Sequence, residues 1–282
     1  MGLLSDTLAD LRAAGLVPRK CLGQHFLTDD NIAGIIVGSV LEGEPERVLE
    51  IGPGLGLLTA RVAPHVRRLV AIEKDPLLAS VARENLKGIT QAEVVEADFL
   101  KADLGALLRG AKWTVMGNLP YSITSPILFR LTEERRRFDR MVLMVQREVA
   151  GRMLARPGSK EFGLLGILVE MHYEARLLKT VSANCFYPPP KVQSAIVELK
   201  VRRQCAVRVD DEQGFFAFCK RLFAHRRKQM VTILKGLLPG KTREAAARYL
   251  EAAGIAPTAR PEQLSIGTMA ALYRTLSAES LR

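Results

Sequence analysis

The sequence is poor in the features that build disulfide frameworks, zinc sites and membrane spans. Its 282 residues include only four widely scattered cysteines with no Cys-x-x-Cys pair, namely Cys21, Cys185, Cys205 and Cys219. This distribution favours reduced thiols in a cytoplasm over disulfides or a zinc site, so we expect a cytoplasmic protein without a metal. Because no uninterrupted apolar run is long enough to cross a bilayer, we expect no membrane partner either.

Low-complexity tracts and internal repeats are also missing, which argues against extended disorder and repeat architectures. Hydrophobic residues make up 48% of the chain and permit a sizeable core. The length suits one large domain, alone or with a smaller one. Residues 1–16 carry Asp6, Asp10 and Arg12 within an apolar spacing, so this stretch is typical of an amphipathic helix and not of a signal peptide.

Acidic residues are fewer than basic ones, 30 against 41, which gives a formal net charge of +11. The positive charge is also clustered, at residues 19–20, 67–68, 135–137, 202–203, 220–221 and 226–228. A solvated helix face explains any single cluster. Six clusters together favour a polyanionic partner, and nucleic acid is the better hypothesis.

Five short apolar runs, separated by stretches of helical character, predict a parallel sheet. Their starts lie a little over twenty residues apart, at residues 47–52, 68–73, 92–98, 113–118 and 141–146. This spacing is typical of strand–helix–strand units, so we expect an α/β fold with ligands at the carboxyl ends of the strands. Two further strands, predicted within 166–178 and 194–202, are expected to close the sheet as an antiparallel hairpin.

The pattern changes after Arg203. From Asp210 onward the chain shows helical periodicity without strands, and Gly and Pro mark the gaps. We therefore predict two domains, an α/β domain over residues 1–205 and a small all-helical domain over residues 206–282.

Three glycines follow the first predicted strand in "VLEIGPGLGLLT". Gly52, Gly54 and Gly56 allow a sharp turn and a close approach of the backbone to a ligand. A nicotinamide-binding fingerprint starting at Gly52 would need glycine at Leu57. The observed spacing, preceded by Glu50, suits S-adenosylmethionine, which has no pyrophosphate to place over a helix N-terminus.

Two carboxylates end the next predicted strands. Glu73 stands 21 residues after Gly52 and is placed to accept both ribose hydroxyls of an adenosine. Asp98, in "EADFL", is placed to accept from the adenine amino group. Each could instead simply cap the following turn or helix, but together with the glycines they predict one nucleoside-shaped site.

The tetrapeptide Asn118–Tyr121, in "VMGNLPYSIT", ends the fourth predicted strand at the same edge of the sheet. The amide oxygen of Asn118 and the carbonyl of Leu119 can accept the two N–H bonds of an adenine amine and so direct its lone pair at a methyl donor. Pro120 stiffens the loop, and Tyr121 offers a ring face to a flipped-out base. In isolation the same residues would make an ordinary proline turn with an aromatic plug.

With these motifs together, the chain resembles the ribosomal RNA adenine N6-dimethyltransferases, most closely the bacterial KsgA type. The resemblance covers nearly the whole chain, through "GQHFL" (23–27), "LEIGPGLGLLT", "IEKD", "EADFL", "NLPYSITSPIL", "NCFYPPPKVQSAIVEL" (184–199) and "FAHRRKQM" (223–230). It implies a Rossmann-like class I methyltransferase sheet that uses S-adenosylmethionine. It also implies that the helical C-terminal domain binds RNA.

The resemblance implies roles for single residues. His25 and Leu27, with Gln24 nearby, would touch the methionine part of the cofactor, and Gly52 would contact it through its backbone. Asn118 would bridge the cofactor and the target amine. Phe186 would close the target pocket opposite Tyr121, and Lys191 would lie near the RNA backbone.

From the residues alone, Phe186 beside three prolines could equally belong to a packed loop. Gln229-Met230 replaces the Thr-Leu frequent in the family, and His25 stands where Asn is common.

The resulting hypothesis is dimethylation of two adjacent adenosines in the 3′-terminal hairpin loop (helix 45) of small-subunit 16S rRNA, with a role in 30S subunit biogenesis. The basic clusters at 135–137, 202–203 and 226–228 are the candidate RNA contacts, and we expect a monomer. The alternatives are a resistance-type methyltransferase of large-subunit rRNA and a non-catalytic assembly factor. A nicotinamide oxidoreductase is disfavoured by the glycine spacing.

Overall fold

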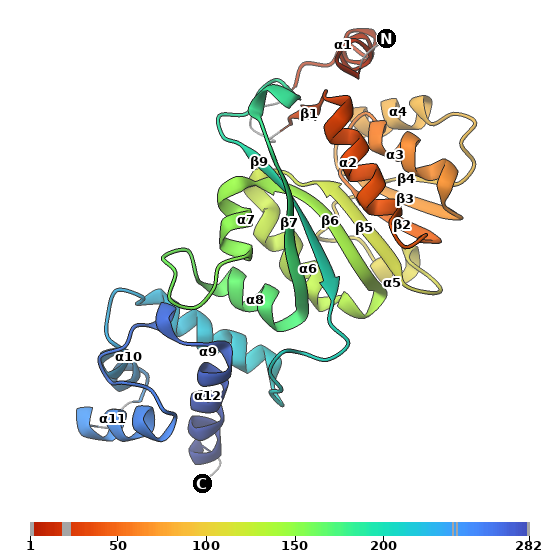
Figure 1. The fold of residues 1–282 in the computed structure, drawn as a ribbon. Coiled ribbons are helices and arrows are strands. Elements are labelled where there is room, and N and C mark those ends of the chain that lie inside the picture. The colour runs from red at the N-terminus through yellow and green to blue at the C-terminus, as the bar shows by residue number, and fades with distance from the viewer. Residues whose placement is uncertain (1–2, 19–23, 239, 241, 281–282) are drawn as a thin grey trace. The chain divides into compact units, whose positions relative to one another are not determined.

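The computed structural model describes residues 3–18, 24–238, 240 and 242–280. The sequence features at Arg19–Lys20, Cys21 and Gly23 lie outside these residues. The chain forms two compact units (Figure 1). The first comprises Met1–Ala150 and Ala175–Val201, and the second comprises Gly151–Glu174 and Arg202–Arg282.

The first unit is built on a seven-stranded sheet of order β4-β3-β2-β5-β6-β9-β7. Its strands are β2 (Arg47–Ile51), β3 (Arg68–Glu73), β4 (Ala92–Glu96), β5 (Trp113–Asn118), β6 (Phe138–Gln146), β7 (Tyr173–Val181) and β9 (Ser194–Val201). The first five pair in parallel, as predicted from their apolar runs, and β9 joins β6 antiparallel. The sheet order reverses beside β2, so the ends of β2, β3 and β5 meet at one edge, where ligands bind in such folds.

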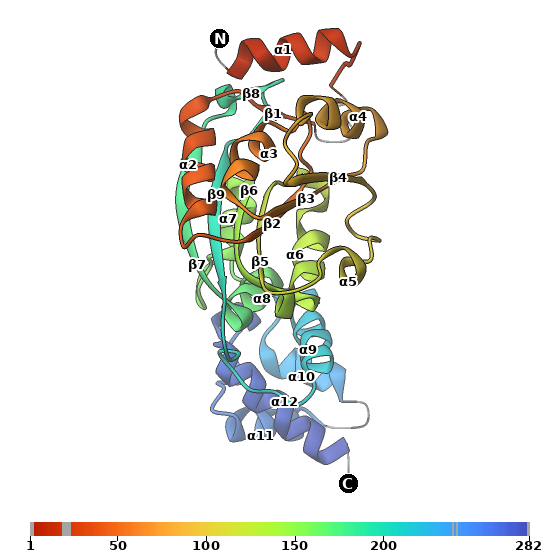
Figure 2. The same cartoon turned by 90° about the vertical axis from the view of Figure 1, so that its right-hand side faces the viewer.

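Helices precede, connect and follow these strands. They are α1 (Leu3–Ala13), α2 (Asp30–Leu41), α3 (Leu57–Val62), η2 (Ala63–His65), α4 (Pro76–Asn85), α5 (Leu104–Leu107), η3 (Tyr121–Ile123), α6 (Thr124–Glu133), η4 (Arg135–Arg137) and α7 (Arg147–Met153). The predicted amphipathic helix at the N-terminus is α1. Ile36 of α2 and Val62 of α3 pack in one buried cluster with Leu69 and Met116 of the sheet, whereas α6 lies on the opposite face (Figure 1, Figure 2).

A short antiparallel ribbon joins two distant parts of the first unit. Its strands are β1 (Phe26–Leu27) and β8 (Phe186–Tyr187), which follows η5 (Ala183–Cys185), and Leu27 pairs with Phe186. The Thr28 N–H donates to the Cys185 carbonyl at 2.8 Å and extends the pairing. This ribbon brings the "QHFL" segment beside the "FYPPP" segment, two motifs that the sequence separates by about 160 residues.

The predicted strand within 166–178 is wrong in its first half. Residues Leu164–His172 form helix α8, and β7 starts only at Tyr173. Nearly every residue of α8 is buried, so its apolar run lacks helical periodicity and has the pattern of a buried strand. The predicted neighbours β7 and β9 do lie side by side in the sheet.

The second unit is helical. Besides α8 it contains α9 (Glu212–Ala224), α10 (Met230–Leu237), α11 (Arg243–Ala252), η6 (Pro261–Gln263) and α12 (Ile266–Ser280). Its extent differs from the predicted domain of residues 206–282, because Phe162, Ile167 and Met171 share one buried core with Phe215 and Leu222 of α9. Residues 151–174 therefore belong to this unit. Within the described residues, every helix is too short or too polar to cross a bilayer.

Candidate active site

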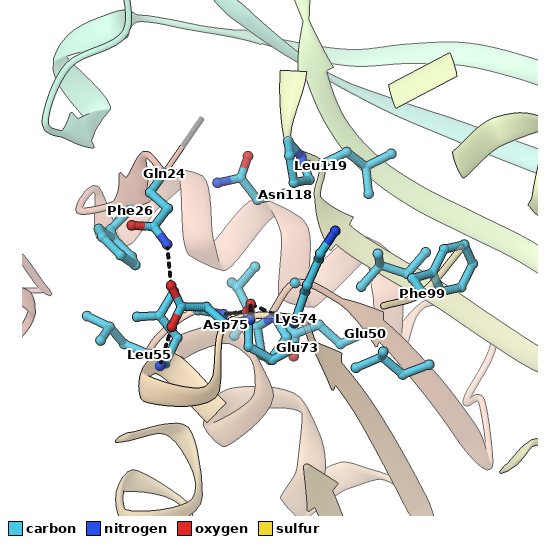
Figure 3. A pocket seen from close by; sticks show the side chains of 18 of the residues that line it. Gln24, Phe26, Glu50, Leu55, Glu73, Lys74, Asp75, Phe99, Asn118 and Leu119 are labelled. Carbon is cyan, nitrogen blue, oxygen red and sulfur yellow. Dashed lines mark hydrogen bonds between the residues drawn. The ribbon is translucent and has the colours of Figure 1, made fainter. Parts of the chain in front are cut away.

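A cavity of about 390 Å³ opens at the carboxyl ends of β2, β3 and β5 in the first unit (Figure 3). Of the residues predicted to hold the cofactor or the target base, all but Gly56 and Phe186 line it. These residues are Gln24, His25, Leu27, Gly52, Gly54, Glu73, Asp98, Asn118, Leu119 and Tyr121. Most of the surface of the cavity is apolar, contributed by residues such as Phe26, Leu55 and Phe99, which the sequence analysis did not single out.

The glycine turn after β2 has the left-handed backbone that favours glycine. Gly52, Gly54 and Gly56 have φ values of +70°, +59° and +82°. A Cβ on Gly54 would also lie 3.2 Å from the Phe26 ring, which is tighter than most real contacts. Both the conformation and the close packing therefore require glycine at position 54.

Glu73, at the end of β3, is tied to this turn. Its carboxylate accepts the N–H of Gly54 at 3.1 Å and the N–H groups of Lys74 and Asp75, both at 2.9 Å. The side chain is buried, and desolvation raises the pKa of its carboxyl despite these hydrogen bonds. The backbone amides hold the two oxygens in one orientation beside the cavity.

Glu50 is a second buried acid of the cavity. It is 2% exposed and its Oε2 accepts the hydroxyl of Thr59 at 2.5 Å. Burial raises its pKa to about 7, and the nearby charge of Glu73 adds to the shift. In the sequence, Glu50 is recognisable only as the residue before the glycines, because the pattern of a strand does not show how deeply one polar residue in it is buried.

Asp98 lies where the sequence predicted, at the turn that follows β4. Its carboxylate pairs with the ammonium of Lys74 at 2.9 Å and accepts the Leu100 N–H at 3.0 Å. The hydrogen bond from Lys74 lowers the pKa of this carboxyl. Asp98 therefore does cap its turn, which was the alternative interpretation, and it lines the cavity at the same time.

Gln24 reaches across the cavity to Asp75, a residue that the sequence analysis did not select. The amide nitrogen of Gln24 donates to the Asp75 carboxylate at 3.1 Å (Figure 3). The other oxygen of Asp75 accepts the Leu77 N–H at 3.0 Å and caps α4. One capping carboxylate thus anchors the segment that carries Gln24 and His25.

Asn118 ends β5 and faces the same cavity. Its amide nitrogen donates to the His25 carbonyl at 2.9 Å, which fixes the amide plane and makes the amide oxygen the acceptor that this side chain offers to a ligand. Leu119, the residue after Asn118, is held in place because its N–H donates to the Met144 carbonyl at 2.9 Å.

Gly117, the residue before Asn118, allows β5 and β2 to approach closely. A Cβ at this position would lie 2.7 Å from the Ile51 carbonyl oxygen, so glycine is required there.

Tyr121 is the first residue of the short η3 helix, and both its hydroxyl and its ring are held by neighbouring side chains. Its hydroxyl lies 2.7 Å from Ser194 Oγ, and its ring stacks on the imidazole of His25 with a centroid distance of 5.6 Å. The imidazole Nδ1 in turn lies 2.7 Å from the Pro188 carbonyl oxygen. Burial raises the pKa of the Tyr121 phenol, so this group stays protonated near neutral pH.

A profile of the family described as ribosomal RNA adenine dimethylase matches residues 16–277 of the chain. The chain belongs to this family. The match includes the cavity and most of the helical unit, and it confirms the resemblance inferred from the motifs.

Two relatives named as rRNA methyltransferases are similar along almost the whole chain. Ribosomal RNA small subunit methyltransferase A of Geobacter metallireducens is 38% identical over 271 residues, 95% of this chain and 98% of that protein. The protein of the same name from Moorella thermoacetica is 40% identical over 279 residues, 96% of each chain.

Solved structures show the same fold. A dimethyladenosine transferase from Plasmodium falciparum is 25% identical with a TM-score of 0.76, over 91% of this chain and 98% of that one. The 23S rRNA methyltransferase ErmE is 28% identical with a TM-score of 0.66, over 89% of this chain and 99% of that one. The fold is thus the Rossmann-like class I methyltransferase fold, as predicted, and the cofactor of this dimethylase family is S-adenosylmethionine.

The residues of the cavity fit that cofactor. The glycine turn leaves no Cβ above the end of β2, two carboxylates end neighbouring strands, and apolar side chains line the space between them. These features match a nucleoside with a polar ribose and a flat apolar base.

Phe186 is placed differently from its predicted position in the wall of the target pocket. Its side chain is 3% exposed and packs in the core with residues of α2, such as Ile32. The neighbouring Tyr187 is the exposed aromatic residue of the "FYPPP" segment. A stacking role for Phe186 stays a prediction that this placement does not support. Lys191 is exposed, as an RNA contact would require.

The basic clusters retain exposed cations. In the first unit Arg136 is exposed, whereas Arg137 pairs with Glu134 at 2.8 Å. In the second unit Arg227 and Lys228 are exposed, and Arg226 donates to the Lys160 carbonyl at 2.7 Å. Each cluster thus combines side chains with local structural partners and side chains that face solvent.

Proposed function

We propose that this family member transfers methyl groups from S-adenosylmethionine to N6 of two adjacent adenosines in the 3′-terminal hairpin loop (helix 45) of small-subunit rRNA, producing N6,N6-dimethyladenosine. The observation that carries the proposal is one cavity that holds the glycine turn, Glu73, Asn118 and Tyr121 together. The names of the relatives, small subunit methyltransferase A, support the choice of substrate.

One part of the cavity would hold the cofactor, which supplies an electrophilic methyl group when bound. Glu73, already oriented by three backbone amides, would accept the ribose hydroxyls. Asp98 would accept the adenine amino group, and Gly52 and Gly54 would contact the methionine part through their backbone. Gln24, His25 and Leu27 would close this part of the site.

The other part would hold the target amine. Its lone pair is delocalised into the adenine ring, which makes it a poor nucleophile. The amide oxygen of Asn118 and the carbonyl of Leu119 would accept its two N–H bonds, direct the lone pair and stabilise the positive charge that develops. A strong general base is not needed, because the methylated amine loses a proton readily to solvent.

Tyr121 would receive the flipped-out base. Because His25 stacks on one face of the Tyr121 ring, the adenine would stack on the opposite face. The hydroxyl contact with Ser194 keeps this face in a fixed orientation. His25 would therefore have a positioning role that the motif resemblance alone did not include.

The rRNA would be recognised by shape and by phosphate contacts, because the grooves of an RNA duplex are hard to read by sequence. We propose the helical unit as an RNA-binding domain, with Arg227 and Lys228 among its contacts, and Arg136, Arg203 and Lys191 as further candidates. The protein would act as a monomer in the cytoplasm, during assembly of the 30S subunit.

Small-subunit rRNA is favoured over large-subunit rRNA as the substrate. The relatives named small subunit methyltransferase A share 38–40% identity over almost the whole chain, whereas the 23S enzyme ErmE shares 28%. The motif "FYPPPKVQS" together with "RRK" supports the same choice.

The proposal is tested by incubating the protein with labelled S-adenosylmethionine and with either small or large ribosomal subunits that lack the modification. We expect label only in the small-subunit rRNA, as dimethyladenosine. Label only in the large-subunit rRNA would show that the protein is a resistance-type methyltransferase instead. Label in neither rRNA would favour a non-catalytic assembly factor that binds RNA.

A further inference from the structure

The second unit contains a cluster of three side chains that are common metal ligands. His172 ends α8, Cys205 lies in the segment between β9 and α9, and Glu212 begins α9. One potential ligand atom from each residue lies within 4.8 Å of the others. None of the three lines the methyl-transfer cavity, so the proposed function gives this cluster no role.

The backbone around the cluster is fixed. The Arg202 N–H donates to the His172 carbonyl at 2.8 Å, and the Ala206 N–H donates to the Met171 carbonyl at 2.9 Å. These bonds hold the segment that carries Cys205 against the end of α8. The third ligand is placed by Asp211, whose carboxylate caps α9 through the Gly214 N–H at 2.9 Å. Because this backbone is already ordered, binding of an ion would cost little conformational entropy.

The two distances that involve sulfur match the edges of a tetrahedral zinc site, whereas Glu212 Oε2 lies 3.9 Å from the other ring nitrogen, His172 Nε2. Cys205 Sγ lies 3.5 Å from His172 Nδ1 and 3.5 Å from Glu212 Oε1. A zinc ion bonded to sulfur at about 2.3 Å and to nitrogen or oxygen at about 2.0–2.1 Å has a tetrahedral edge of about 3.6 Å between such ligands. Both sulfur edges of the cluster therefore have the length that one shared ion requires.

Burial and charge also suit an ion. The His172 ring is 2% exposed and stacks on Phe216 with a centroid distance of 5.9 Å, so its orientation is fixed. The Glu212 side chain is 35% exposed and leaves an entry path from solvent. A thiolate and a carboxylate would together neutralise a dication, which lowers the cost of holding it beside a buried ring.

We propose that His172, Cys205 and Glu212 bind one Zn²⁺ ion, with a water molecule in the fourth position. Binding would release the thiol proton of Cys205 to solvent and keep His172 neutral, with Nδ1 as the ligand atom. The ion would clamp the segment 202–211 to the end of α8. This inference does not depend on the proposed methyl transfer, and it changes the expectation of a metal-free protein.

The experiment uses the full chain, stripped with a chelator and titrated with Zn²⁺ in competition with a chromophoric chelator. Cys205→Ser and Glu212→Gln each remove one ligand while keeping a similar shape. Cys185→Ser is the matched control, because the Cys185 thiol also lies near a carboxylate, 3.6 Å from Asp29 Oδ2, but outside the cluster. A parallel titration with Co²⁺ reports the ligands directly through the thiolate-to-cobalt absorption band.

We expect one Zn²⁺ per chain in the wild type and in Cys185→Ser. Loss of a ligand should weaken binding by more than the roughly 10–100-fold that loss of a supporting contact causes. The cobalt band should appear in the wild type and be missing in Cys205→Ser. A wild type without the band, or equal Zn²⁺ affinity in Cys205→Ser, Glu212→Gln and the wild type, would overturn the proposal. The wild-type spectrum decides even if a variant fails to fold.

Discussion

The imidazole of His25 stacks on the phenol ring of Tyr121, with ring centroids 5.6 Å apart and an angle of 25° between the planes. The two residues lie 96 positions apart in the sequence and belong to the two halves of the proposed site. His25 also supplies the carbonyl that fixes the Asn118 amide. The residue thus links the cofactor segment to both groups that would hold the target base.

His25→Ala should weaken the reaction through the position of Tyr121, and it should also weaken binding of the cofactor, whose methionine part the imidazole would touch. The backbone carbonyl that holds Asn118 remains, whereas the ring that supports Tyr121 is lost. An aromatic pair contributes about 0.5–1.5 kcal/mol, which corresponds to about a 2–10-fold loss in kcat/KM for the RNA substrate. Steady-state kinetics with His65→Ala, an exposed histidine, as control checks this. An unchanged kcat/KM would remove His25 from the target site.

Glu73→Gln should weaken binding of S-adenosylmethionine. The substitution removes a charge that accepts three backbone N–H groups, and its amide nitrogen would face those donors. Hydrogen bonds to charged groups contribute about 1.5–3 kcal/mol, so we expect a 10–100-fold higher Kd by calorimetry. Glu96→Gln, at an exposed position of β4, serves as control and should bind normally. Equal Kd values for both variants would contradict the ribose role.

The buried carboxyl of Glu50 should make the free energy of unfolding depend on pH. Its pKa is about 7 in the folded protein against an ordinary value of 4.5, so the folded state holds the proton more tightly. Stability from this group is therefore greatest below pH 4.5, falls as the pH rises from 4.5 to about 7, and is constant above. The free energy of unfolding of Glu50→Gln, relative to the wild type, should rise by about 2–3 kcal/mol between pH 5 and pH 8.

Urea unfolding of both proteins at these two pH values measures this difference. Glu84→Gln, at an exposed position of α4, should show no change relative to the wild type. A difference between Glu50→Gln and the wild type that stays constant with pH would show that the Glu50 carboxyl titrates normally.

Gly117→Ala should disturb the end of β5. The new Cβ would lie 2.7 Å from the Ile51 carbonyl oxygen, so β5 and β2 would have to separate slightly. Overpacking of this kind costs about 1–3 kcal/mol, and the displaced Asn118 should lower kcat. Gly38→Ala is the control, because a Cβ there meets no atom within 4 Å and helix α2 should be stabilised. Normal stability and kcat in Gly117→Ala would show that the strand end tolerates the shift.

The parallel sheet could be predicted from the sequence because each of its first five strands is a short apolar run between helices. The glycine turn, Glu73, Asp98 and Asn118 could be predicted as one site because parallel strands present their ends at one edge. Helix α8 could not, since its burial on almost all sides removes the periodicity that distinguishes a helix. The boundary predicted at residue 206 missed residues 151–174 for the same reason. The apolar run of helix α8 predicts a strand of the sheet, whereas the helix packs with α9 in the second unit.

Contacts that depend on pairing between distant parts of the chain could not be predicted from the sequence. Pairing of β1 with β8 places His25 near Pro188 and buries Phe186 in the core, and no local pattern signals that pairing. The cluster of His172, Cys205 and Glu212 comes from three separate segments, without the short ligand spacing that marks a zinc motif.

The central claim is that Asn118 holds the target amine in the reactive half of the cavity. Its most direct test is to map dimethyladenosine by mass spectrometry in the 3′-terminal hairpin of small-subunit rRNA after reaction with the wild type and with Asn118→Ala. We predict dimethylation of both adjacent adenosines by the wild type, and a loss of about 100–1,000-fold or more in rate in the variant, with RNA binding retained. Modification elsewhere by the wild type, or a nearly normal rate in Asn118→Ala, would contradict the account.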